Sequence, residues 1–165
     1  MGARKVVASL VIATLCGATD GPAFAAPSQQ FTEADRAQVK DVLLRQAAAA
    51  SAHDIAAFEQ VLVSVPPGHQ DPIVMVARAY QFWGKTALIN HFKETFKGVW
   101  KFKPEVESIR IIPLTLDVAQ AYARTQITLG HSDASAKIAP YLVYEVAVRT
   151  SEGWRIASIV LEPAQ

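Results

Sequence analysis

The sequence predicts an α+β fold, with helices in the first half of the chain and an antiparallel sheet in the second half. Three observations lead to this prediction. Apolar residues recur at helical spacing between Val39 and Ala50. A period-two alternation takes over after Glu105. The alternating runs are separated by short polar turns at 116–117, 131–135 and 151–153, which is typical of strands joined as an antiparallel meander.

Capping residues mark two helices at the start of the domain. Thr32 and Asp35 resemble a capping box, and the helix that follows contains the run "QAAAASA", which has little side-chain bulk. Asp54 can cap a second, short helix with the apolar face Ile55, Phe58 and Leu62. We therefore interpret His53-Asp54 as a helix end followed by a helix start, rather than as a catalytic pair.

The middle of the chain predicts a hairpin and a third helix. "VLVSV" (61–65) and the alternating run 76–83 are interpreted as two strands. Pro66, Pro67 and Gly68 end the first strand, so a long loop with His69 and Asp71 connects the two. The spacing of Ile89, Phe92 and Phe96 predicts a helix over 85–97, which Gly98 ends.

Four strands follow, and alternation assigns their faces. In "DVAQAYARTQITLG" the face with Ala119, Ala121 and Ala123 should meet the helices, as should Leu142, Tyr144, Val146 and Val148 in "APYLVYEVAVRT". The mixed faces, with Tyr122, Arg124, Glu145 and Arg149, should then lie on the convex side. A reversed register would instead bring Arg124 and Glu145 inside.

The N-terminus resembles a secretory signal. Arg4 and Lys5 precede an apolar run at 6–15 that is too short to span a bilayer, and Ala23-Phe24-Ala25 is an A-x-A cleavage motif. We expect residues 1–25 to be removed and residues 26–165 to form a single domain in the periplasm or outside the cell, with no membrane association after cleavage. A lipoprotein signal at Cys16 and a retained anchor are the weaker alternatives.

Composition excludes several classes of protein. Cys16 is the only cysteine, so the processed chain would have no disulfide and no thiol nucleophile. Loss of Arg4, Lys5 and Asp20 would leave 14 basic and 14 acidic residues, and this neutral balance argues against a nucleic-acid partner. No metal set is recognised around His53, His69 and Asp71, and His91 and His131 are expected at the surface.

Four segments together resemble the nuclear-transport-factor-2-like superfamily, and within it the SnoaL-like group. They are "HDIAAFE", "FWGKTALINHF", "LDVAQAYA" and "GWRIASIVLEP", within the span Phe31 to Pro163. The resemblance implies a cone-shaped domain: three N-terminal helices packed in the concave face of a strongly bent, mainly antiparallel sheet, with a pocket at the open end. It also implies dimers. It implies no single activity, since the family contains isomerases, dehydratases, hydrolases and binding modules.

The resulting hypothesis is a small-molecule binding domain that needs no metal or organic cofactor. Aromatic residues are expected to line the pocket, with His69 and Asp71 at its mouth; the proposed set is Tyr80, Trp83, Phe92, Trp100, Tyr144, His69 and Asp71. The ligand would be a small apolar or aromatic molecule, and a homodimer is expected through the convex face. The alternatives are a cofactor-free acid–base enzyme of the isomerase, dehydratase or hydrolase type, and a dimerising accessory scaffold.

Overall fold

A computed structural model describes residues 30–78 and 80–164 of the chain. The predicted signal segment, residues 1–25, lies outside the described residues. Among the described residues, no helix has the length and apolar character needed to cross a membrane.

The helices begin where the capping residues predict. The Thr32 side chain accepts from the Asp35 backbone and the Asp35 side chain accepts from the Thr32 backbone, which completes a capping box at the start of α1 (Glu33–Ser51). The Asp54 carboxylate accepts from the Ala57 N–H at 2.9 Å and starts α2 (Ile55–Val61). The third helix, α3 (Lys85–Thr95), ends two residues earlier than expected. Two short 3₁₀ turns, Val106–Ser108 and Asp133–Ser135, complete the helical elements of the described residues.

The described residues form a seven-stranded sheet in the order β2-β1-β7-β6-β5-β3, and β4 also pairs with β5. Every pairing between its strands is antiparallel except β1 with β7, which is parallel. The strands are β1 (Val74–Ala77), β2 (Tyr80–Trp83), β3 (Val99–Pro104), β4 (Arg110–Pro113), β5 (Val118–Gly130), β6 (Lys137–Thr150) and β7 (Gly153–Pro163). The predicted four-strand meander is thus confirmed as β4–β7.

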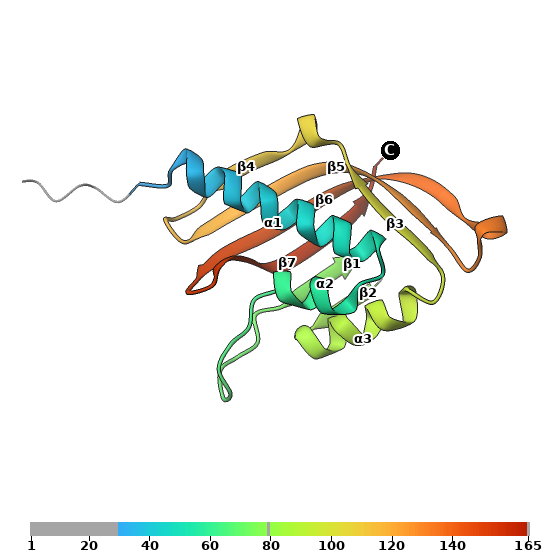
Figure 1. The fold of residues 1–165 in the computed structure, drawn as a ribbon, viewed down its shortest axis with the longest axis horizontal. Coiled ribbons are helices and arrows are strands. Elements are labelled where there is room, and N and C mark those ends of the chain that lie inside the picture. Colours follow the sequence, from blue (N-terminus) through green and yellow to red (C-terminus); the bar gives the residue numbers. More distant parts are fainter. Residues whose placement is uncertain (1–29, 79, 165) are drawn as a thin grey trace, which may run out of the picture.

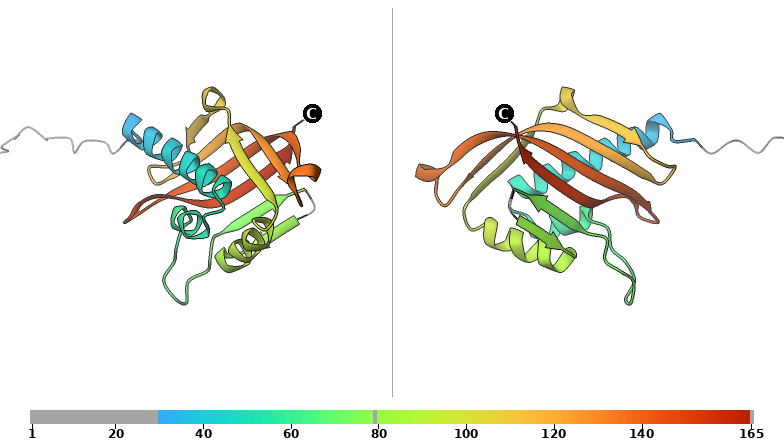
Figure 2. Two further views of the ribbon diagram at one scale, coloured as in Figure 1. Left: turned by 45° about the vertical axis from the view of Figure 1, so that its right-hand side comes forward. Right: turned by 180° about the vertical axis from the view of Figure 1, so that it is seen from behind.

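All three helices lie on one side of the sheet (Figure 1). Seen from behind, the strands face the viewer and no helix covers them (Figure 2). A bulge between Val146 and Ala147 shifts the register of β6 against β7, and bulges of this kind bend a sheet locally. The predicted fold class is confirmed: three helices pack on an open, mostly antiparallel sheet.

Three local predictions were wrong. Residues 61–65 form no strand; Val61 ends α2, and Leu62 makes only a single bridge to Ile156 of β7. The run 76–83 is not one strand but parts of two, because the chain turns back after Arg78, which adopts a left-handed φ of 54°. The loop with His69 therefore connects α2 to β1 and does not interrupt a hairpin. Strand β3 was not predicted at all.

The prediction of which strand face meets the helices is confirmed for β5 and wrong for β6. On β5 the alanine face is buried, as expected, with Ala119, Ala121 and Ala123 almost inaccessible to solvent. On β6 the assignment is reversed: Glu145, 2% exposed, lies on the helix side, whereas Tyr144, 37% exposed, lies on the outer face opposite Tyr122 of β5. The Tyr122 and Tyr144 ring centroids are 5.1 Å apart.

Polar contacts join α1 to the sheet at both ends of the helix. At its start, Arg149 of β6 donates from Nη2 to Asp35 Oδ1 at 2.7 Å and from Nε to Asp117 Oδ1 at 3.0 Å. At its end, the Ser51 hydroxyl donates to the Phe102 carbonyl and accepts from the Phe102 N–H of β3, at 3.0 and 2.8 Å. Arg149 therefore binds on the helix side, which also corrects its predicted convex position.

Candidate functional site

A cavity of about 730 Å³ opens at the end of the sheet beyond the last turn of α1. Its volume lies within the range of small-molecule pockets, roughly 300–1,000 Å³. Its apolar walls come from β1, β3 and the far ends of β5, β6 and β7. They are Met75, Trp100, Ile127, Leu129, Ala139, Tyr141 and Leu161. No residue of α1 contributes, so the short side chains of the alanine run are not the cause of this cavity.

Aromatic stacking positions the inner wall of the cavity. The Trp100 ring meets Phe92 edge-on at 5.8 Å and stacks on Phe102 at 6.2 Å between centroids. Phe92 itself is fully buried and packs on Phe58 at 4.4 Å. Phe92 thus supports the wall from behind, and Trp100 presents its surface to the cavity.

His91 is a residue of this site that the sequence interpretation placed at the surface. Its ring is half buried, stacks on Phe82 with 4.1 Å between centroids, and lines the cavity beside Tyr80. Its Nε2 lies 3.4 Å from the Thr95 hydroxyl. Burial lowers the pKa of His91, because the charged imidazolium loses hydration. The ring is therefore held in its neutral form near pH 7.

The rim of the cavity carries charge. Glu94 and Lys97 form an ion pair of 2.6 Å on this rim. Arg78, in the β1–β2 turn, places its guanidinium carbon 5.6 Å from the centroid of the Tyr141 ring. Lys137 lies at the start of β6, on the same face of that strand as Tyr141.

The structure brings two of the predicted ligand-binding residues to the cavity, Tyr80 and Trp100. Phe92 lies behind the wall. Trp83 pairs with Val74 at the sheet edge and is 69% exposed, and Tyr144 lies on the outer face. Neither Trp83 nor Tyr144 is among the residues that line the cavity, and for Tyr144 the reason is the reversed face of β6.

His69 and Asp71 also lie away from the cavity. Asp71 accepts from the Ile73 N–H at 2.9 Å and from the Lys85 N–H at 2.6 Å. The second bond caps α3, whose N-cap residue, Gly84, has no side chain to do so. His69 is exposed in the same loop. Asp71 thus has a structural role at this helix start.

The pair His53-Asp54 has the structural role that the sequence indicates. Asp54 caps α2, and His53 follows the end of α1 with a left-handed φ of 57°. The His53 ring stacks on Phe96 at 4.9 Å between centroids, and its Nε2 lies 3.0 Å from the Trp100 carbonyl. It therefore ties the end of α1 to α3 and β3. No cluster of three His, Cys, Asp or Glu side chains able to hold a metal ion occurs among the described residues.

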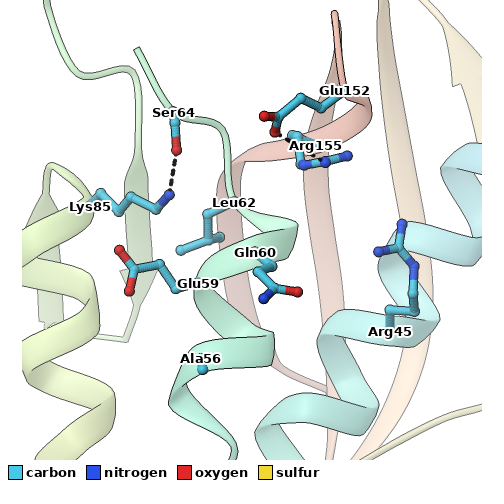
Figure 3. A pocket seen from close by; sticks show the side chains of 9 residues that line it. All are labelled: Arg45, Ala56, Glu59, Gln60, Leu62, Ser64, Lys85, Glu152 and Arg155. Atoms are coloured by element: carbon cyan, nitrogen blue, oxygen red, sulfur yellow. Dashed lines mark hydrogen bonds and ion pairs between the residues drawn. The ribbon is translucent and has the colours of Figure 1, made fainter. Parts of the chain in front are cut away.

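A second hollow, of about 590 Å³, lies between α1, α2 and the β6–β7 turn. Its lining is mostly polar, with charged side chains on several elements (Figure 3). Lys85 donates to the Ser64 hydroxyl at 2.7 Å, and Arg155 lies 3.4 Å from Glu152. These groups are engaged with each other across an open, solvated surface. The apolar cavity is consequently the better candidate for a binding site.

One buried acid lies outside both hollows. Glu145 projects from β6 into the core between Ala121 of β5 and Ile159 of β7, and its Oε1 has no hydrogen-bond partner among the described residues. Burial raises the pKa of Glu145 to about 8, because the carboxylate form would lose its hydration without compensation. At neutral pH this side chain is therefore mostly protonated.

Comparison with known proteins identifies the fold. A family model described as SnoaL-like domain matches residues 39–162. Among solved structures, a proposed aromatic ring hydroxylase from Novosphingobium aromaticivorans superposes with a TM-score of 0.70 at 15% identity, covering 82% of this chain and 93% of that one. A proposed dehydratase of the nuclear-transport-factor-2-like family from Streptomyces avermitilis gives 0.68 at 16%, covering 80% and 97%.

A protein of unknown function from Mycobacterium tuberculosis superposes with a TM-score of 0.66 at 13% identity, over 81% of this chain and 73% of that one. No match is found among curated proteins. At these identities the similarity establishes the fold alone.

Proposed function

The chain belongs to the SnoaL-like domain family, and from this premise we propose that it binds a small, largely apolar molecule in the cavity beyond α1. The observation that supports the proposal is the cavity of about 730 Å³ itself, with Trp100, Tyr141 and Leu129 among its walls. Apolar and aromatic walls with a few polar groups are the usual composition of a small-molecule site.

A neutral apolar fluorophore tests the proposal. N-phenyl-1-naphthylamine should bind saturably, with a rise in its emission, because the apolar walls remove it from water. Leu129→Trp should fill part of the cavity and weaken binding at least tenfold, whereas Trp83→Ala, at the exposed sheet edge, should leave it unchanged. Equal binding by the wild type and the Leu129 variant would place the probe elsewhere and contradict the proposal.

A second candidate function, a cofactor-free proton transfer, is favoured by His91. A neutral imidazole on the wall of an apolar cavity is a suitable general base. Deuterium exchange at the acidic CH₂ of 2-tetralone, measured by NMR above the buffer rate, should then be accelerated by the protein and abolished in His91→Gln. Exchange at the buffer rate would contradict the enzymatic candidate and leave the binding function intact.

Two further proposals concern the state of the protein in the cell. Export with cleavage after Ala25 is supported by the A-x-A motif, and N-terminal sequencing of the exported protein should begin at Ala26. A protein that begins at Met1 or at a lipid-modified Cys16 would contradict it.

A homodimer through the outer face of the sheet is supported by the Tyr122–Tyr144 pair and by exposed Val76 and Ile112 on a face without helices (Figure 2). Tyr144→Arg should shift sedimentation from dimer to monomer, because it places a charge among these apolar side chains. Lys93→Glu, on exposed helical surface, is the matched control and should leave the dimer unchanged. A wild-type monomer at micromolar concentration would contradict the homodimer.

A further inference from the structure

The charges on the cavity rim do not balance. Glu94, the acidic residue of the lining, is engaged by Lys97 through both carboxylate oxygens, at 2.7 and 2.6 Å. Arg78 and Lys137 line the same cavity, and neither side chain forms an ion pair or a hydrogen bond with another described residue. The cavity therefore combines apolar walls with two cations that have no anionic partner.

Arg78 is held in place at the cavity mouth. Its backbone adopts a left-handed conformation, which is uncommon for a residue other than glycine and fixes the turn between β1 and β2. Its guanidinium lies over the ring of Tyr141, a buried residue of the wall. Arg78 is exposed, and its five N–H donors find no acceptor among the described residues, so they are available to a ligand that lies against Tyr141.

Lys137 lies at the other end of the same strip of sheet. Lys137, Ala139 and Tyr141 share the inner face of β6, since successive side chains of a strand alternate. Lys137 precedes Tyr141 by four residues along the strand, a rise of about 13 Å. The apolar strip between the two cations is lined by Ala139 and, on β5, by Ile127 and Leu129. This separation suits a ligand whose apolar body covers the strip and whose charged head meets the arginine.

From this arrangement we infer that the natural ligand is an apolar carboxylic acid, bound as its carboxylate, with its head group on Arg78 and its body against Trp100, Leu129 and Ala139. The inference rests on the proposed function and specifies its ligand class. Arginine presents two parallel N–H groups to a carboxylate, and this paired geometry adds specificity as well as binding energy. Lys137 adds longer-range attraction for the same charge.

A matched pair of probes tests the charge separately from the binding. 2-Naphthoate and 2-naphthamide share one ring system and differ in charge. Calorimetric titration should give a Kd for naphthoate at least tenfold below that for naphthamide. Raising NaCl from 50 to 500 mM should weaken naphthoate binding and leave naphthamide binding unchanged, because salt screens the ionic contact.

The variants assign the effect to one side chain. Arg78→Asn keeps a residue that tolerates the left-handed backbone, and should raise the naphthoate Kd to that of naphthamide without changing the latter. Lys137→Met should weaken naphthoate by less than about twofold, because the attraction between charges this far apart is largely screened. Lys101→Met, on the outer face of β3, is the matched control and should change neither.

The outcomes separate the two claims. Equal affinity for the two probes, or an Arg78→Asn variant that weakens both equally, would contradict the carboxylate inference while leaving small-molecule binding intact. Failure of naphthamide, naphthoate and N-phenyl-1-naphthylamine to bind a folded protein would contradict the proposed function and the inference together.

Discussion

The concave face of the sheet has two halves that differ in how they are covered: α1 covers one half, and the other half is open. Helix α1 crosses the sheet on this face (Figure 1), and beneath it β5 presents the small side chains of Ala119, Ala121 and Ala123, which are almost inaccessible to solvent. Beyond Ser51, where α1 ends, the same strand continues with larger residues, Ile127 and Leu129, and a cavity remains. The cavity therefore results from the length of the helix and not from the size of the side chains on it.

The largest loss of stability should come from removing a large buried side chain beneath α1, in the covered half. Trp154 is 2% exposed, meets Phe31 edge-on at 5.7 Å between centroids, and lies beneath the guanidinium of Arg149 at 4.7 Å. Trp154→Ala should lower the free energy of unfolding by about 3–5 kcal/mol, measured by urea titration. A loss below about 1 kcal/mol would show that the covered half tolerates a void, which would remove the contrast with the open half.

The second prediction concerns pH and the buried acid of the covered half. The pKa of Glu145 is about 8 in the folded protein against 4.5 for an ordinary glutamate. The folded state therefore holds a proton that the unfolded state releases, and stability should fall by about 1.4 kcal/mol per pH unit between these values. Below pH 4.5 the contribution is fully present; it is lost as the pH rises through about 8.

Unfolding titrations at pH 5.5 and 7.5 check this slope, and Glu145→Gln should flatten it. Asp35 has the opposite shift: hydrogen bonds from Thr32 and Arg149 lower its pKa to about 2. Its contribution is present above the ordinary value of 3.8 and is lost as the pH falls through about 2. If Glu145→Gln keeps the wild-type dependence of stability on pH between 5.5 and 7.5, the Glu145 carboxyl is hydrated in the folded protein.

A third prediction makes a similar change in each half. Ala123→Leu adds bulk beneath α1, where no space is left, and should cost about 1–3 kcal/mol of stability. Leu129→Trp adds bulk where the cavity lies and should cost less than about 1 kcal/mol. Urea titration of the two variants compares them directly. Equal losses would show that the open half is as closely packed as the covered one.

The smallest effect is expected at the sheet edge. Trp83 projects from β2 with most of its ring in solvent. Trp83→Ala should change the free energy of unfolding by no more than about 0.5 kcal/mol, in contrast to Trp154→Ala. The same urea titration checks it, and a loss comparable to that of Trp154→Ala would indicate that Trp83 is covered in the folded protein.

The sequence predicted the helices and the long strands because their signals are local. Thr32 and Asp54 cap helices through neighbouring N–H groups, and β5 alternates buried inner with more exposed outer residues along most of its length. Strand β3 carries an equally regular pattern, with Trp100 and Phe102 between lysines. Alternation could therefore have identified this strand from the sequence as well.

The remaining features depended on long-range contacts. Strand β6 has apolar residues on both faces, so alternation could not tell which face meets the helices. Glu145 made the buried face look polar, and the other face was therefore predicted to meet the helices. The β1–β2 turn uses Arg78 where turns usually carry glycine or asparagine. Because the sequence did not predict this turn, it could not show that Arg78, His91 and Lys137 line one site.

The position of β7 in the sheet has a consequence for the order of folding. This last strand lies between β1 and β6, so it joins the β2–β1 hairpin to the meander. Pairings such as Met75 with Ile159 close a loop of more than 80 residues, and such distant contacts form slowly. During synthesis the β2–β1 hairpin and the meander therefore remain unjoined until β7 has emerged from the ribosome. The cavity, whose wall includes Leu161 of β7, is incomplete until then.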